Sequence, residues 1–406
     1  MNETIFVQIA SYRDPQLLPT LKDLFDKAKY PDNIKVCVAW QHNKNDSWDN
    51  LDEFKDDTRL DIIDIDYLTA KGACWARNLI QQRYNGETYT LQLDSHHRFE
   101  KDWDETCINM LKDLQDKGHK KPLLTSYIPS FDPENDPNGR VDTPWGMQFD
   151  RFTPEGVVFF MPYYMERFKL NPEPARWFSA HFCFTLGQHC IEVPHDPEYY
   201  FHGEEITLAV RSFTHGYDLF HPNKVVAYHE YTRKGRTKQW DDDNTWNDKN
   251  LFCHKKVRSL LGVDGENEIK EEKYGLGTER TLQDYELYAG IRFQNRSITK
   301  QCKDNYPPPG EKDSLFYQEF KHAIAVNHND FAKNDYTFCA IIFEDEKGGP
   351  LHREDYPGHL FNSKLESARK GEQFVIWKTY QGPKPDKIIL WAGNEKGWQE
   401  KSIQIL

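Results

Sequence analysis

The feature that most constrains the fold of this chain is a regular alternation of short apolar runs with longer amphipathic segments. Residues 5–10 form an apolar run of the kind that lies buried in a parallel sheet. The next segment starts with Asp14-Pro15, an N-cap followed by proline at the first helical position, and apolar residues continue at helical spacing to residue 28. The strand pattern returns at residues 34–39, 62–65 and 89–93. This alternation predicts an α/β fold that binds its ligands beyond the carboxyl ends of the strands.

The pattern of the chain changes near residue 330. Beyond it, short strand-like runs are separated by Gly-Pro and glycine-rich turns, which is typical of a small β module. We therefore predict a catalytic domain over residues 1–300, a linker over 301–330 and a β-rich accessory module over 331–406. Prolines recur among polar residues between positions 129 and 154, and this composition predicts a long irregular loop near the site.

Composition argues against several classes of function. The formal net charge of −13 disfavours nonspecific binding to nucleic acid. No run of about 18 apolar residues is present, so a membrane span is not expected. The eight cysteines lack CxxC pairing, and the N-terminus lacks a basic region followed by a cleavage pattern. We expect reduced thiols and a cytoplasmic protein.

The segment Asp94-Ser95-His96 follows the apolar run at 89–93, where the chain must leave the sheet. Asp94 and His96 lie two positions apart, so at a strand end their side chains can converge on one cation. His229 ends another apolar run and is the candidate third ligand. A mixed set of carboxylate, imidazole and phosphate oxygens suits Mn²⁺, with Mg²⁺ or another divalent ion as the alternative. An Asp-x-His alone often occurs by chance, and its strand-end position is what favours a metal site.

Two basic features suit the diphosphate of a nucleotide. Arg233 and Arg236 lie in a basic turn just after His229, in a chain that is otherwise acidic. The alternative for this segment is a solvated loop beside a lone core histidine. Arg77 stands early in a predicted helix, where it would reach phosphate or uracil oxygens unless it is an ordinary surface arginine.

Two adjacent carboxylates, Glu204 and Glu205, stand at the start of another predicted helix. Helix capping alone would explain them, because the helix dipole favours negative charge at this end. In a glycosyl-transfer site they would instead bind hydroxyl groups of the sugar or the acceptor, and the preceding Gly203 would let a ligand approach.

Several segments together resemble a known family: Ile9 to Pro15, Gly72 to Asn78, Leu93 to His96, Gly203 to Glu205 and Gly275 to Leu282. In this order they are similar to the cytoplasmic hydroxyproline N-acetylglucosaminyltransferases and their bacterial relatives, over roughly residues 4–295. The same ordering resembles the polypeptide N-acetylgalactosaminyltransferases. Here His202 stands in place of a glycine and Glu205 in place of an asparagine.

The resemblance implies a GT-A fold, the fold of nucleotide-diphospho-sugar transferases, with a small C-terminal β module outside the likeness. It implies a retaining enzyme that uses a UDP-sugar and manganese, with Asp94, His96 and His229 at the metal. Glu204 and Glu205 would contact the sugar or the acceptor. Residues expected at the nucleotide sugar are Ser11, Tyr12, Arg13, Asp14, Arg77, Asp94, Ser95, Arg233 and Arg236, and the last two would close over the diphosphate.

The leading hypothesis is transfer of GlcNAc from UDP-GlcNAc to a hydroxyl group, with a protein side chain as acceptor. A polysaccharide or another glycan is the alternative acceptor, because the motifs describe the donor better than the acceptor. The alternative from another class is an inactive protein that binds nucleotide sugars or glycans. No carboxylate is clearly placed as a nucleophile, so front-face attack on the donor is expected, and a trapped glycosyl-enzyme adduct would contradict it.

Overall fold

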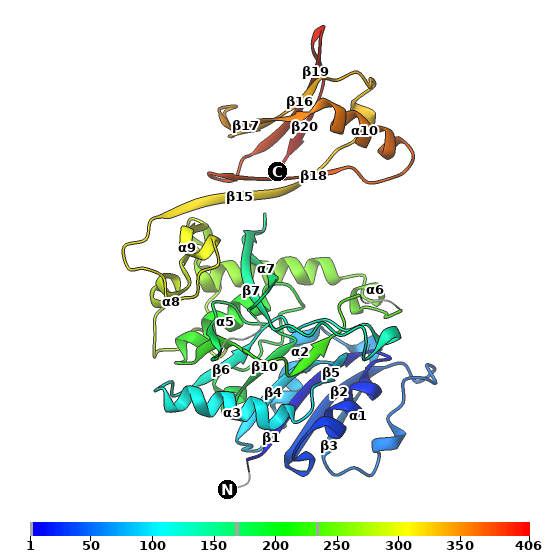
Figure 1. Cartoon of the computed structure of the whole chain (residues 1–406), viewed down its shortest axis with the longest axis vertical. Helices are drawn as coiled ribbons and strands as arrows, with labels where there is room; N and C mark the ends of the chain where they lie inside the picture. Colours follow the sequence, from blue (N-terminus) through cyan, green and yellow to red (C-terminus); the bar gives the residue numbers. More distant parts are fainter. Residues whose placement is uncertain (1–2, 167–169, 233–234) are drawn as a thin grey trace.

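The computed structural model describes residues 3–166, 170–232 and 235–406, and its centre is an eight-stranded mixed sheet (Figure 1). In spatial order the strands are β3 (Leu60–Asp66), β2 (Ile34–His42), β1 (Ile5–Tyr12), β4 (Tyr89–Asp94), β10 (Phe182–Leu186), β6 (Pro122–Thr125), β11 (Asp218–His221) and β9 (Glu173–Pro174). The first four run parallel, whereas β10 runs antiparallel to both β4 and β6. The predicted α/β fold is confirmed, with a sheet that is mixed rather than wholly parallel.

Helices cover both faces of this sheet, because successive side chains of a strand point to opposite sides. Val7 and Ile9 of β1 pack with α1 (Leu17–Lys27) and α3 (Trp103–Asp116), whereas Phe6 packs with α2 (Ala73–Gln81). The remaining helices are α4 (His189–Glu192), α5 (Glu204–Thr214), α6 (Gln239–Asp242), α7 (Trp246–Leu261), α8 (Leu282–Ala289), α9 (Lys300–Lys303) and α10 (Gly358–Arg369). In the described part of the chain, no helix combines the length and the apolar character needed to cross a membrane.

Two small antiparallel sheets flank the central one. The first pairs β5 (His97–Phe99) with β12 (Ala227–His229), directly beyond the end of β4. The second is a hairpin of β7 (Trp145–Phe152) and β8 (Val158–Tyr164). Strand β7 lies inside the stretch predicted to be an irregular loop, so that prediction is wrong for these residues. Met147 and Phe149 are buried against the aromatic core around Trp177, and this packing outweighs the proline-rich composition nearby.

Two four-stranded antiparallel sheets follow along the chain, and the strands of the second one stand at the top of Figure 1. One contains β13 (Ile291–Arg292), β14 (Ser297–Thr299), β15 (Phe316–Ala325) and β18 (Val375–Gln381). The other contains β17 (Pro350–Pro357), β16 (Phe338–Glu344), β19 (Lys387–Asn394) and β20 (Gly397–Ile405), and α10 packs against it.

The stretch predicted to be a linker, residues 301–330, holds most of α9 and all of β15. Strand β15 pairs with β14 on one side and with β18 on the other, so it joins the C-terminal part to the end of the preceding region. The division into residues 1–300, 301–330 and 331–406 remains a prediction.

Candidate active site

The candidate metal ligands meet at the carboxyl edge of the central sheet. Asp94 is the last residue of β4, and the chain then turns into β5. The pairing of β5 with β12 sets His229 opposite His97 and so carries it back to the end of β4. Ligand atoms of Asp94, His96 and His229 lie within 4.8 Å of one another. Nε2 of His229 is 3.4 Å from Oδ2 of Asp94, and Nε2 of His96 is 3.6 Å from the same oxygen.

The protonation states of these groups suit a divalent cation. Nδ1 of His96 lies 2.7 Å from Oδ2 of Asp14, and an ionised carboxylate can only accept, so Nδ1 donates and Nε2 is the nitrogen that faces Asp94. Burial, together with His181 and His96, lowers the pKa of His229 well below its usual value, so this ring is neutral. Nδ1 of His229 is buried and has no hydrogen-bond partner among the described residues. Neutral imidazoles and an ionised Asp94 are the forms that bind metal, and the mixed N/O donor set fits Mn²⁺.

Asp14 contacts His96 and Ser95, which the sequence did not predict. Its side chain is buried, and Oδ2 accepts a hydrogen bond from Oγ of Ser95 at 2.7 Å in addition to its contact with His96. Burial raises the pKa of Asp14, but His96, Arg236 and Ser95 outweigh it and leave the pKa below its usual value. A carboxylate that holds the second nitrogen of a metal-binding histidine fixes both the tautomer and the ring orientation. The structure thus sets Asp14 and Ser95 behind His96.

A pocket of about 170 Å³ opens in front of the metal ligands. Tyr12 at the exit of β1 forms one wall, and Trp240 of α6 and Phe201 lie in the wall as well. The hydroxyl of Tyr12 donates to Asp242 at 2.8 Å, and Arg13 bonds the same carboxylate at 3.0 Å, so α6 is tied across the mouth of the pocket. The pocket therefore has candidate metal ligands in its wall and α6 at its rim.

The structure describes only one of the two arginines that were predicted to bind the diphosphate. Arg233 lies outside the described residues. Arg236 lies in the pocket wall, with Nη1 2.9 Å from Nε2 of His96 and 3.1 Å from Oδ2 of Asp14, and with Nη2 3.0 Å from Oε2 of Glu230. Among the other predicted nucleotide contacts, Ser11 is buried and is not part of the pocket wall.

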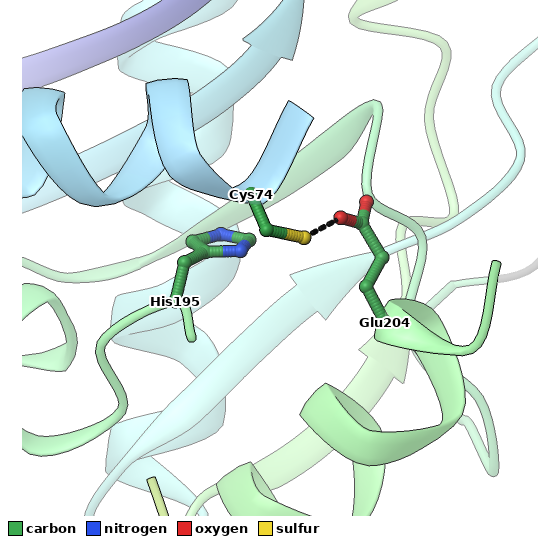
Figure 2. Close-up of side chains that lie close together, drawn as sticks. All are labelled: Cys74, His195 and Glu204. Carbon is green, nitrogen blue, oxygen red and sulfur yellow. Dashed lines mark hydrogen bonds between the residues drawn. The ribbon is translucent and has the colours of Figure 1, made fainter. Parts of the chain in front are cut away.

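Arg77 connects the metal ligands with the start of α5. Its guanidinium is buried, and it bonds Oδ1 of Asp94 at 2.7 Å and Oε1 of Glu204. The other oxygen of Glu204 accepts from the thiol of Cys74 (Figure 2). Gly203, just before α5, has a φ of 102°, and a Cβ there would lie 2.5 Å from a methyl carbon of Val257. The glycine therefore allows Glu204 to enter this buried position.

Glu205 faces a different set of groups from Glu204. One of its oxygens accepts from the backbone N–H of Ala180 at 2.9 Å, and the other accepts from the hydroxyl of Tyr127 at 2.7 Å. Burial raises the pKa of Glu205 to about 7, although these two donors act in the opposite direction. All four oxygens of the two glutamates thus have partners within the protein.

Several residues of the site escaped the sequence analysis: Cys74, Tyr127, Phe201, Trp240 and Asp242. None of them belongs to a sequence motif that predicts a functional role. Cys74 and Phe201 do lie within or beside segments that carry the family resemblance, and this proximity was the only available signal.

Comparisons with known proteins bear on the family and the fold of this chain. The family model described as "Glycosyltransferase (GlcNAc)" matches residues 4–59 and 49–295. No curated protein matches the chain. Among solved structures, GalNAc-T7 with UDP, GalNAc and Mn²⁺ is similar, with 11% identity and a TM-score of 0.54 over 99% of this chain and 72% of that one. TarS from S. aureus in complex with UDP-GlcNAc shows 12% identity and a TM-score of 0.41 over 65% of this chain and 68% of that one.

The fold is that of GT-A glycosyltransferases, and the pocket at its sheet edge lies where such folds bind ligands. Because the family model spans most of the chain, the protein belongs to the GlcNAc glycosyltransferase family. The GT-A fold implied by the resemblance is thus confirmed, whereas the narrower family of hydroxyproline N-acetylglucosaminyltransferases remains a prediction. The roles of individual site residues remain predictions.

The titration of Glu205 gives a stability prediction. Its pKa rises from 4.5 to about 7 on folding, so the folded state binds more protons between these values and the free energy of unfolding falls as pH rises through them. One pKa unit is worth about 1.4 kcal/mol, and partial exposure reduces the effect, so we expect a fall on the order of 2 kcal/mol. Glu205→Gln should remove this component in urea unfolding at several pH values.

The control for this prediction is Glu366→Gln, at an exposed position of α10. It should leave the pH dependence of the wild type in place. Parallel pH profiles for Glu205→Gln and the wild type would contradict the raised pKa.

Proposed function

We propose that this glycosyltransferase moves GlcNAc from UDP-GlcNAc to a hydroxyl group of a polypeptide, on Ser, Thr or hydroxyproline, with retention of anomeric configuration. The observation that carries the proposal is the convergence of Asp94, His96 and His229 on one pocket at the sheet edge, in a chain of the GlcNAc glycosyltransferase family. The GT-A neighbour GalNAc-T7 was crystallised with UDP and Mn²⁺, which supports a nucleotide-sugar donor and a divalent metal here.

Asp94, His96 and His229 would hold the metal. A bound divalent ion offsets the negative charge that grows on the departing diphosphate. Asp14 orients the ring of His96, because its carboxylate accepts a hydrogen bond from Nδ1. Arg236 now lies against Nε2 of the same ring, so it must withdraw when a metal binds there, and we propose that it then contacts the diphosphate.

Tyr12 and Arg13 are proposed to position the nucleotide. Both bond Asp242 at the rim of the pocket, so they share a partner with α6. Release of Asp242 would let α6 open for the donor, and renewed contact would close it. Arg233 keeps its predicted role at the diphosphate.

The state of the two glutamates argues against a double displacement. A double displacement needs a carboxylate oxygen free to attack the anomeric carbon. The oxygens of Glu204 face Arg77 and Cys74, and those of Glu205 face Ala180 and Tyr127. We therefore favour front-face attack, in which the acceptor oxygen bonds the anomeric carbon, the bond to UDP breaks, and the acceptor proton passes to a phosphate oxygen of the leaving group.

The acceptor is the part of the proposal that rests most on the family resemblance. A polypeptide is favoured by the ordered motifs shared with hydroxyproline and polypeptide transferases. A cytoplasmic location is proposed as well, because the eight cysteines are all buried and unpaired, as expected in a reducing compartment.

The first prediction concerns donor turnover. With Mn²⁺ and UDP-GlcNAc, the protein should release UDP slowly even without an acceptor, and Asp94→Asn should lower this rate by at least about a hundredfold because a charged metal ligand is lost. Measurement of UDP release checks it. The control Asp113→Asn, on the exposed side of α3, should keep the wild-type rate. Binding of UDP-GlcNAc without any turnover would favour the inactive binder.

The second prediction concerns stereochemistry. Nuclear magnetic resonance of the first product formed on a Ser-, Thr- or hydroxyproline-containing peptide should show the same anomeric configuration as the donor. Inversion would exclude the retaining mechanism. Transfer to glycans but not to any of these peptides would replace the polypeptide acceptor while leaving the donor assignment intact.

A further inference from the structure

A second group of potential metal ligands lies beneath the donor pocket. Cys74 comes from the first turn of α2, Glu204 from the first turn of α5, and His195 from the segment after α4 (Figure 2). Their ligand atoms lie within 4.8 Å of one another, and all three side chains are at least nine-tenths buried. This group is separate from the set formed by Asp94, His96 and His229.

The tautomer of His195 is fixed by its neighbours. The amide nitrogen of Gln92 donates to the carbonyl of Ala180 at 2.7 Å, so the amide oxygen of Gln92 faces Nε2 of His195 at 2.6 Å. Nε2 must therefore carry the proton, and Nδ1 keeps a lone pair. Burial, with a contribution from Arg77, lowers the pKa of His195 well below its usual value, so the ring is neutral. This is the arrangement in which an outer partner orients a metal-binding histidine.

The thiol of Cys74 donates to one oxygen of Glu204. Nδ1 of His195 belongs to the same group, because the ligand atoms of the three residues lie within 4.8 Å of one another. One cation would contact the sulfur, the nitrogen and the oxygen together.

The types of the three ligands and the size of the adjoining cavity indicate which cation would bind. A thiolate, an imidazole and a carboxylate are the ligands of Zn²⁺, and a three-residue set leaves a fourth position for water. A cavity of about 10 Å³ adjoins the cluster, which is close to the space that one water needs. The hydroxyl of Tyr199, buried and without a partner among the described residues, lines the same cavity.

The charges nearby include both signs. Arg77 pairs with Glu204 and Asp94, Lys256 pairs with three carboxylates (Asp196, Glu198 and Glu271), and Arg211 also lines the cavity. Five carboxylates therefore contact or lie beside three cations. A divalent ion that displaces the thiol proton to solvent adds one net positive charge, which this surplus of carboxylates tolerates.

We propose that Cys74, His195 and Glu204 form a second metal site, selective for a thiophilic divalent cation of the Zn²⁺ type. An ion there holds one oxygen of Glu204 while Arg77 holds the other. It therefore fixes Glu204 and, through Arg77, the metal ligand Asp94. The site does not depend on the identity of the acceptor or the donor.

The experiment titrates metal-free protein with Cd²⁺, which substitutes for Zn²⁺ and gives an ultraviolet charge-transfer band when a thiolate binds it. We expect the band to reach the intensity of one thiolate-bound Cd²⁺ per chain in the wild type and to disappear when Zn²⁺ is added. Cys74→Ser should abolish it. Cys37→Ser, at an equally buried cysteine of β2, and Asp94→Asn should both retain it.

Cadmium nuclear magnetic resonance on the wild type gives a second readout that needs no variant. A single resonance typical of one sulfur ligand with nitrogen and oxygen ligands supports the site. The proposal is overturned if no thiolate band forms, if the band survives in Cys74→Ser, or if it is lost equally in Cys37→Ser. Because neither readout involves UDP-GlcNAc, this outcome is independent of the donor-turnover result.

Discussion

The buried guanidinium of Arg77 is the interaction on which the site depends. It bonds Asp94 at the end of β4 and Glu204 at the start of α5, so it joins the candidate metal ligands to the start of α5. Burial alone would disfavour the charge of Arg77, but the two carboxylates overcome this effect and raise its pKa. Removing a partner from such a buried set costs several kcal/mol, since the remaining charge stays desolvated. Asp94 is thus held in place before any ligand arrives.

The chain reaches this arrangement through strand order. Parallel pairing of β1 with β4 brings the segment after Tyr12 beside Asp94, and the β5–β12 pair returns His229 to the same edge. Asp14 then fixes His96 from behind. Residues more than two hundred positions apart in the sequence become neighbours because a few short strands end at one edge of the sheet.

The sequence predicted a good part of this arrangement. Apolar runs located β1, β2, β3 and β4, and the strand-end position of Asp94 correctly placed it beside His96 and His229. It could not predict β7, whose pairing depends on packing against Trp177, nor β15, whose partners are distant in sequence. Asp14 was assigned to the nucleotide because no local pattern shows which way a carboxylate faces after a strand. The sequence around Cys74 does not identify it as a metal ligand, because only the folded chain brings it close to His195 and Glu204.

The central claim is that Asp94, His96 and His229 form one metal site that serves a UDP-sugar. Electron paramagnetic resonance of Mn²⁺ added to the protein with UDP-GlcNAc tests it most directly. The account predicts one tightly bound Mn²⁺ per chain, with couplings to two imidazole nitrogens, and loss of one coupling in His229→Ala. Tight binding without nitrogen coupling, or an unchanged spectrum in His229→Ala, would contradict it.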